Sequence, residues 1–407
     1  MQDVLKLAVV FLIIIIFMWL KKPISAAVLA AGIGTVLLYG LSPGEAAAAA
    51  AKGAFERTTA ETLLVFYSIT YLQRMMEKRK NLSGAHQALN GLFNNNRINA
   101  SLAPFLLGML PAAGTVLICG PIVRESVKDS LSVEEAACVT SYYRHISESF
   151  LPTYTSIFIA IAMTGGRVSA PAFILAMLPM VAALMFTGWL VYLRKVPKDT
   201  GMAPDQPRGY YWRLLAKSVW PIALTIALIL ILGLPVELAV LGSILVNVKV
   251  NRFGARECLS FFKTAFEARL LLNTWLVMIF KEILTAAGVI AALPGFFSGL
   301  PIPAFLIFSL IFLFGTIVAG TQAMIVLCMP MAMATVAAGH TGLALFVLLM
   351  CITYVSMQIS PVHICLLLCA EDYGISLGAL VKKTLPLVAV FTAIAMAYYG
   401  ILSAFGF

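Results

Sequence analysis

Hydrophobic positions along this chain are gathered into long blocks that short polar connections separate. A bilayer-spanning helix needs about 20 largely apolar residues, and many of the blocks reach that length. The pattern predicts an all-α polytopic membrane protein. Its ten expected spans are 4–20, 24–41, 57–76, 133–163, 170–193, 214–232, 234–250, 268–288, 340–370 and 377–401.

Two further apolar segments, 100–123 and 303–338, are interrupted near their middle by Gly, Ala and Thr. Pro121 and Pro330 follow these interruptions. Broken backbone at membrane depth is tolerated only where protein or a water-filled cavity satisfies its polar groups. We therefore expect each segment to be a re-entrant hairpin that enters and leaves on the same side of the membrane.

The second half of the chain repeats features of the first. The sequence KGAFE at 52–56 recurs as KTAFE at 263–267, and LPMVA at 178–182 recurs as LPLVA at 385–389. A duplicated membrane unit with Gly and Pro breaks at matching depths is typical of a secondary transporter. Further matching pairs are Gly108 with Gly315, Cys119 with Cys328, Pro121 with Pro330, and Pro152 with Pro361.

The repeat divides the chain into three parts: a first repeat at 1–193, a polar cytoplasmic linker at 194–217 and a second repeat at 218–407. Each repeat holds one hairpin and one span that is broken near a proline, namely 133–163 and 340–370. Five spans and one hairpin make an odd number of crossings. The second repeat is therefore expected to insert upside down relative to the first.

Basic residues support this inverted topology, because they concentrate in the loops that it places inside. The loops that it places outside, 42–51, 164–169, 233–237 and 289–302, contribute only Arg167. The protein is expected in the cell's inner (plasma) membrane. With ten spans, both chain termini are expected on the outer side of that membrane. Segments 43–56 and 252–267 fit either amphipathic arms on the membrane surface or extensions of the neighbouring spans.

Composition agrees with a membrane protein and argues against nucleic-acid binding. Hydrophobic residues make up 61% of the chain and charged residues 11%. The net charge of +10 comes from basic residues in short loops, which is a sign of topology and not of a basic binding surface. The first apolar run precedes Lys21 and Lys22, the reverse of a signal peptide's charge order, so we expect it to remain as a span.

The seven cysteines form no CxxC pair. Cys365 and Cys369 share a helix face, but no clustered His or carboxylate completes a metal site with them. We expect buried free thiols and assign no metal site.

The repeated order of two spans, an arm, one span, a hairpin, a broken span and a final span resembles the ion transporter superfamily. That superfamily includes divalent-anion:sodium symporters, citrate and gluconate permeases, and arsenite pumps. Segments 108–115 (GMLPAAGT) and 146–152 (ISESFLP) are most similar to a branch of it known only as a domain of unknown function. The resemblance implies an elevator-type transporter, usually a homodimer, whose hairpins and broken helices carry substrate past a scaffold.

Symporters of dicarboxylates carry Ser-Asn-Thr at both hairpin tips, whereas this chain has AGT at 113–115 and GTQ at 320–322. Only Thr115 and Thr321 match. The coupling ion is therefore left open between a proton and Na⁺. The expected substrate is a small organic anion, because the N-termini of half-helices favour negative groups.

Polar residues gather at four interruptions: 112–115, 147–153, 319–322 and 356–363. A broken helix exposes N–H groups at one half-helix start and C=O groups at the other half's end, and these can hold an anion and a cation respectively. The predicted substrate-binding residues are Thr115, Ser149, Thr153, Thr321, Gln322, Ser360 and His363. The predicted ion-coupling residues are Glu148, Ser147, Gly114, Gly320, Ser356 and Gln358. No cofactor beyond the coupling ion is expected.

Glu148 is the sharpest individual prediction, because a carboxylate within an apolar span must be paired, protonated or used. It fits a proton carrier, or a structural pair with Arg144 or His145. His363 fits an anion ligand, a proton relay or a satisfied core histidine. Lys281 and Glu282 are expected to neutralise neighbours or each other.

Enzyme motifs are weak or absent. GISLG at 374–378 matches a hydrolase pattern, but it links two predicted helices, where Ser376 suits a helix N-cap. The sequence has no Walker A loop and no HExxH. We expect a transporter and not an enzyme, with an ion channel as the alternative and a membrane-embedded hydrolase as a remote one.

Overall fold

The computed structural model describes residues 22–93, 95–109, 115–198, 205–288, 301–337, 339–361 and 363–407, together with 6, 9, 10, 12–14, 16, 17 and 20. These parts of the chain are helical and contain no strand. The predicted span 4–20 lies mostly outside the described residues. In chain order the α-helices are α2 (Ile24–Tyr39), α3 (Pro43–Phe55), α4 (Arg57–Lys78), α5 (Asn81–Phe93), α6 (Asn96–Gly108), α7 (Thr115–Val127), α8 (Val133–His145), α9 (Thr155–Met163), α10 (Ala170–Val191), α11 (Arg208–Leu230), α12 (Val236–Val250), α13 (Ala255–Thr264), α14 (Ala268–Ala286), α16 (Ala304–Ala319), α17 (Thr321–Ala334), α18 (Leu343–Met357), α19 (Ile364–Tyr373) and α20 (Leu377–Ala404).

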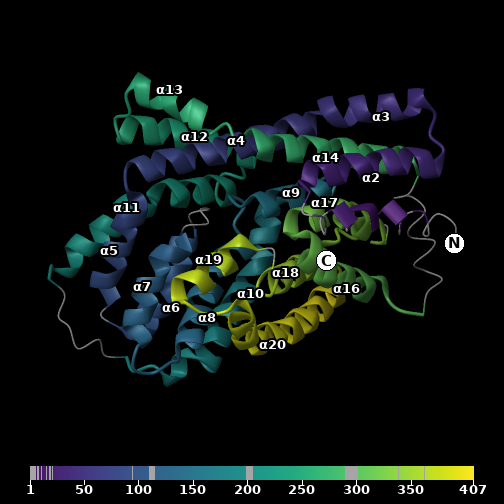
Figure 1. Cartoon of the computed structure of the whole chain (residues 1–407). Helices are drawn as coiled ribbons and strands as arrows, with labels where there is room; N and C mark the ends of the chain where they lie inside the picture. Colours follow the sequence, from purple (N-terminus) through teal and green to yellow (C-terminus); the bar gives the residue numbers. More distant parts are fainter. Residues whose placement is uncertain are drawn as a thin grey trace.

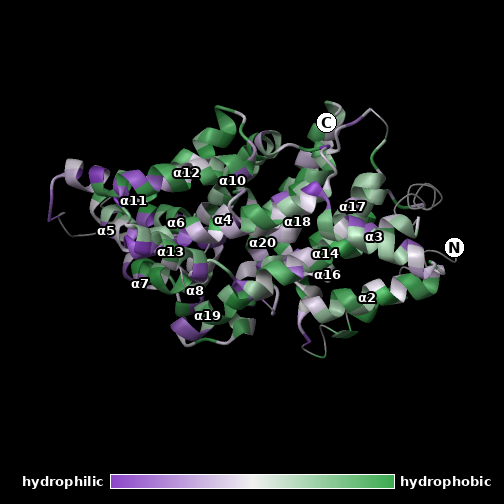
Figure 2. Ribbon diagram, turned by 90° about the horizontal axis from the view of Figure 1, so that it is seen from above, coloured by the Kyte–Doolittle hydropathy of each residue, from purple (hydrophilic) through white to green (hydrophobic). Residues whose placement is uncertain are grey.

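The chain is an all-α polytopic membrane protein, as the hydrophobic pattern predicts. Among the described residues, α10, α11 and α20 are long and apolar enough to cross a bilayer, and several shorter helices are equally apolar. Figure 2 shows hydrophobic residues along outlying helices such as α2 and α12. Leu37 on α2 is 75% exposed and Leu245 on α12 is 71% exposed. Apolar faces of this kind suit contact with lipid and not with water.

The two predicted arms are separate helices. Ser42 and Glu45 form a capping box at the start of α3, and the hydrogen bond from the Ser42 backbone N–H holds the pKa of Glu45 below its ordinary value. Glu56 is extended, with ψ of 146°, so α3 ends before α4 begins. α13 likewise ends at Thr264, before α14. Helix extension is therefore the wrong alternative for both segments.

Helix α5 is missing from the sequence prediction, which treats 77–99 as a loop. Its apolar residues Ala85, Leu89 and Leu92 are buried and lie about one turn apart along one face. The helix packs against α11, where Asn81 Nδ2 donates to the Ser218 carbonyl at 2.8 Å. A search for fully apolar runs misses such a half-polar helix.

The linker is also shorter than predicted, because α11 begins at Arg208 and not at 214. Pro207 precedes its first turn, which is a favourable position for proline. The first turns of α11 carry Arg208, Arg213 and Lys217, and these basic residues conceal the start of the helix in a hydropathy profile.

Elements of the two halves pack reciprocally (Figure 1). Helix α3 packs on α14 while α13 packs on α4, and α2 packs on α14 while α12 packs on α4. The pair α6 and α7 packs on α8 and α19, and the pair α16 and α17 packs on α18 and α9. Reciprocal contacts are typical of a two-fold relation between two copies of one unit.

The helices form two layers in Figure 1: α2, α3, α4 and α11 to α14 in one, and α6 to α8, α10, α16 and α18 to α20 in the other. Helices α9 and α17 lie between the layers, and they contact α4 and α14 respectively. All residues of α18 are buried, as are the last ten residues of α8. The core of the molecule is therefore centred on the two helices that lead into the proline breaks.

Candidate functional site

Both proline-containing spans are broken. Helix α8 ends at His145, a 3-10 turn η1 follows at Ile146–Ser149, and α9 begins only at Thr155. Helix α18 ends at Met357 and α19 begins at Ile364. Pro152 and Pro361 lie in these gaps, where they remove a backbone donor and disfavour helical geometry in the residue before them.

The two predicted hairpins are interrupted as well. Gly320 separates α16 from α17 with φ of 85°, a conformation that residues with a Cβ rarely adopt. Residues 110–114, including the predicted Gly114, lie outside the described residues, and α7 begins directly after them at Thr115. Each hairpin thus presents the N-terminus of a helix, at Thr115 in one and at Thr321 in the other.

Serines attach each hairpin to a broken helix. Ser147 Oγ donates to the Phe105 carbonyl at 2.7 Å, and Ser356 Oγ contacts the Phe312 carbonyl at 3.5 Å. The two contacts correspond to each other in the repeat, since 207 residues separate the phenylalanines and 209 separate the serines. Ser360 Oγ also donates, to the Ile317 carbonyl at 3.0 Å.

These bonds limit what the predicted serines can bind. A hydroxyl has one proton, and Ser147, Ser149 and Ser360 each place it on a backbone carbonyl. The lone pairs that remain are acceptors, which suit a cation. Donors for an anion have to come from other groups.

Eight buried side-chain polar atoms have no hydrogen-bond partner among the described residues, and three of them are Thr153 Oγ1, Thr316 Oγ1 and Gln358 Oε1. Gln358 is held through its Nε2, which donates to the Tyr354 hydroxyl at 2.8 Å. A buried polar atom without a partner is uncommon and calls for a water molecule, an ion or a ligand. Thr153 and Gln358, both predicted site residues, are therefore available for binding. Thr321 and Gln322 are half-buried at the start of α17, and Thr115 is fully buried.

Arg144 enters the sequence prediction only as a structural partner for Glu148 and is not among the predicted site residues. Its side chain is 1% exposed, and it forms an ion pair with Glu148, whose side chain is 11% exposed. The structure therefore contains the ion pair with Arg144 that the sequence offers as the structural interpretation of Glu148. The signal in the sequence is an arginine inside an apolar span beside a proline break.

Gly108 brings the first hairpin close to this ion pair. A Cβ at Gly108 would lie 2.1 Å from the Arg144 carbonyl oxygen and 3.1 Å from Ser147 Oγ. The Tyr154 hydroxyl donates to the Gly108 carbonyl from the other side of the break. Helix α6 can approach α8 this closely only because glycine occupies the contact.

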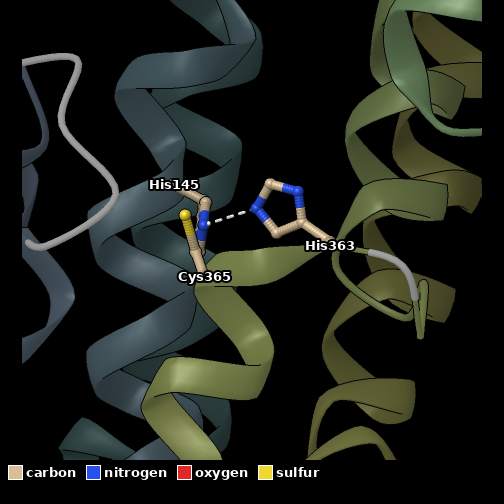
Figure 3. A group of neighbouring side chains, drawn as sticks. All are labelled: His145, His363 and Cys365. Carbon is tan, nitrogen blue, oxygen red and sulfur yellow. Dashed lines mark hydrogen bonds between the residues drawn. The ribbon is translucent and has the colours of Figure 1, made fainter. Parts of the chain in front are cut away.

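The two breaks meet at a pair of histidines (Figure 3). The Nε2 atoms of His145 and His363 are 3.0 Å apart, and Cys365 lies beside them. His145 is fully buried, His363 is half-buried and Cys365 is 4% exposed. The expectation that no clustered histidine completes a metal-binding group with Cys365 is wrong, because the fold adds His145 from the other half of the chain to His363 and Cys365. The expectation of free, mostly buried thiols holds for the described cysteines.

Lys281 and Glu282 lie away from the breaks and neutralise each other and a neighbour, as predicted. Lys281 Nζ is 3.2 Å from Glu282, and Lys52 Nζ on α3 is 2.7 Å from the same carboxylate. The hydrogen bond with Glu282 raises the pKa of Lys52. Ser376 caps α20 by accepting from the Ala379 N–H, as the helix-link interpretation of GISLG requires.

Two open surface cavities lie elsewhere. One of about 370 Å³ is lined by residues that include Arg97, Tyr143 and Trp189, and another of about 520 Å³ by residues that include Arg74 and Phe261. Neither cavity contains a predicted site residue.

Comparison with known proteins gives one family and one solved structure of interest. The model of the family described as "Protein of unknown function (DUF401)" matches residues 4–402. No curated protein matches the sequence. The YdaH transporter of Alcanivorax borkumensis, whose crystal structure has an unusual topology, is similar with a TM-score of 0.54 and 12% identity over 86% of this chain and 88% of that one. At this identity the similarity concerns the fold.

Proposed function

The chain belongs to the DUF401 family, and from that premise we propose that it is a secondary active transporter that moves a small organic anion together with protons or sodium ions. The structural similarity to a transporter over most of both chains supports this class of function. The helix breaks in the buried centre of the molecule support a transporter independently, because transporters bind ions and substrates at broken helices of this kind.

The observation that carries the proposal is the buried ion pair of Arg144 and Glu148 at the break after α8. Burying two charges costs more free energy than their attraction returns unless the geometry is excellent, so a pair of this kind inside a membrane points to a functional site. Arg144 is the hydrogen-bond donor that an anionic substrate needs. Glu148 competes with the substrate for Arg144.

A coupling scheme follows from this competition. Protonation of Glu148 removes its charge, and Arg144 then requires another anion. The substrate carboxylate takes that place, so proton and anion occupy the site together. Thr115, Thr321 and Gln322 at the two helix N-termini, with Thr153 and His363, supply donors to the substrate. Ser149 and Ser360, whose protons are given to backbone carbonyls, line the site without donating to it.

Sodium is the second coupling ion to consider, because the serine hydroxyls of the site offer acceptors. Ser147, Ser356 and Gln358, with the backbone at Gly114 and Gly320, form the ion-coupling set in that case. Hard cations prefer oxygen ligands of this kind.

We place the moving part at the boundary between the two layers. The hairpins and broken helices form the transport unit, and α2 to α4 with α11 to α14 form the scaffold. In this elevator scheme α9 and α17 slide along α4 and α14. The two halves are inverted repeats of the ion transporter superfamily type, the protein is a homodimer in the inner membrane, and both termini face outside.

The test is uptake by purified protein in liposomes. Radiolabelled organic acids are supplied under an inward proton gradient, an inward sodium gradient, or neither. We expect saturable uptake of at least one acid that requires one of the gradients. Ungated single-channel currents that do not saturate would point to a channel, and release of a cleaved product would point to an enzyme.

A further inference from the structure

His145, His363 and Cys365 form a compact group of metal-binding side chains (Figure 3). One ligand atom from each, an imidazole nitrogen or the thiol sulfur, lies within 4.8 Å of the others. His145 comes from the end of α8, whereas His363 and Cys365 flank the start of α19. Imidazole and thiolate are the ligands that zinc and similar borderline-soft ions prefer.

We propose that these three residues bind a divalent transition-metal ion of the zinc class between the two halves of the protein. In a tetrahedral zinc site two imidazole nitrogens lie about 3.3 Å apart, given zinc–nitrogen distances of about 2.0–2.1 Å. The two Nε2 atoms are already 3.0 Å apart. Small side-chain rotations bring the ligands to coordination distance, and three protein ligands leave a fourth position for water or a small anion.

The hydrogen bonds around His145 orient it as a metal ligand. Its Nδ1 lies 2.6 Å from the Ser141 carbonyl, to which it donates its proton. The lone pair is therefore on Nε2, which faces His363. Metal-binding histidines commonly have such a carbonyl on the opposite nitrogen, because it fixes the ring and its tautomer.

Proton balance is simple. The ion replaces the hydrogen bond between the histidines, and the Nε2 proton of His363 moves to its Nδ1. The thiol of Cys365 binds as the thiolate and releases one proton to solvent. The charged groups that act on the cluster are Arg144 and Glu148, an ion pair without net charge, so the thiolate leaves a bound divalent ion with one uncompensated charge.

This site goes beyond the proposed transport function and does not depend on it. A bound ion would join the end of α8 to the start of α19, two helices that already pack together. It would hold both breaks in the conformation seen here. The consequence is stabilisation of the folded protein, since ligands that bind only the native state raise its stability.

The experiment uses the full-length protein in detergent after chelator treatment. Titration with Co²⁺ is followed by absorption, because a thiolate ligand produces a sulfur-to-cobalt charge-transfer band that water and histidine do not. We expect one ion per chain, competition by Zn²⁺, and a Tm that rises with Zn²⁺ concentration. Loss of the band is expected in Cys365→Ser, and at least about tenfold weaker binding in His145→Gln and His363→Gln.

Cys369→Ser is the matched control, since Cys369 is a buried thiol one turn further along α19, where it donates to the Ala137 carbonyl. That variant should keep the band and the Zn²⁺ affinity. The Tm of each metal-free variant checks folding, and Cys365→Ser alone decides the matter if a histidine variant does not fold. Absence of the band in the unmodified protein, or its survival in Cys365→Ser, overturns the proposal whether or not the protein transports anything.

Discussion

The Nε2 atoms of His145 and His363 face each other across 3.0 Å, although 218 residues separate them in the chain. One histidine ends α8 and the other precedes α19, so the two helix breaks share a single contact point. Arg144 and Glu148 are one residue and one turn away from it. The polar chemistry of the protein is thus gathered at the junction of its two halves.

Replacing Glu148 by Gln removes the carboxylate that competes for Arg144 in the proposed coupling. We expect proton-driven uptake to fall at least about a hundredfold, the lower end of what a positioned proton-transfer group contributes. The measurement is uptake into liposomes with and without an imposed pH gradient. Glu134→Gln, at a partly exposed position near the start of α8, is the control that should transport normally. Undiminished proton dependence in Glu148→Gln removes this residue from the coupling scheme.

Arg144→Gln leaves the carboxylate of Glu148 without its cation in a buried position. Breaking a buried pair in this way costs about 3–5 kcal/mol, and we expect the free energy of unfolding to fall by that amount. The double variant Arg144→Gln/Glu148→Gln should recover most of the lost stability, because neither charge then remains buried. Thermal unfolding of the two single variants and the double variant, compared as a cycle, measures the coupling. Additive effects of the two substitutions would contradict a direct ion pair.

Gly108→Ala should separate the first hairpin from α8, because the new methyl group collides with the Arg144 carbonyl. Overpacking of this kind costs about 1–3 kcal/mol. Gly400→Ala on α20, where nothing lies within 4 Å of the added carbon, provides the comparison and should be neutral or slightly stabilising. Equal Tm values for the two variants would show that α6 and α8 are not in this close contact.

Gly320→Ala tests the backbone of the second hairpin. With φ of 85° and ψ of 161° the alanine occupies a region that is essentially restricted to glycine, at a cost of about 1–3 kcal/mol, and we expect the hairpin tip to change conformation and uptake to be lost while the fold persists. Gly40→Ala places an alanine in the left-handed α region at the end of α2, with φ of 70° and ψ of 31°, at a cost of about 1–2 kcal/mol, and it lies in the proposed scaffold. We expect this control to lose some stability and to keep its uptake. Matching uptake in both variants would leave Gly320 without a role in transport.

Much of the fold follows from local sequence signals. Long apolar runs make a membrane protein because only a helix satisfies every backbone group in lipid, and prolines at 152 and 361 lie in helix breaks because they lack the N–H that a helix needs. Helix α5 escapes such reasoning, since one buried face is enough to hold it against α11 and the rest of it can be polar.

The site is predictable only in part. Ser147, Thr153 and Gln358 lie at the breaks as expected, yet the bonds of their polar atoms depend on the neighbouring hairpins. Arg144 is visible in the sequence as a charge in an apolar span. The sequence does not show that its side chain is buried, or that it lies between the first hairpin and the break after α8.

The sequence by itself determined the membrane class of this protein and the breaks at Pro152, Pro361 and Gly320, because composition, proline and glycine act on the few residues around them. Tertiary structure alone decided that His145 meets His363 and Cys365, and that Gly108 lies against Arg144. Such contacts depend on how distant helices pack, and that packing is set by the summed fit of many side chains that no single segment of the chain contains.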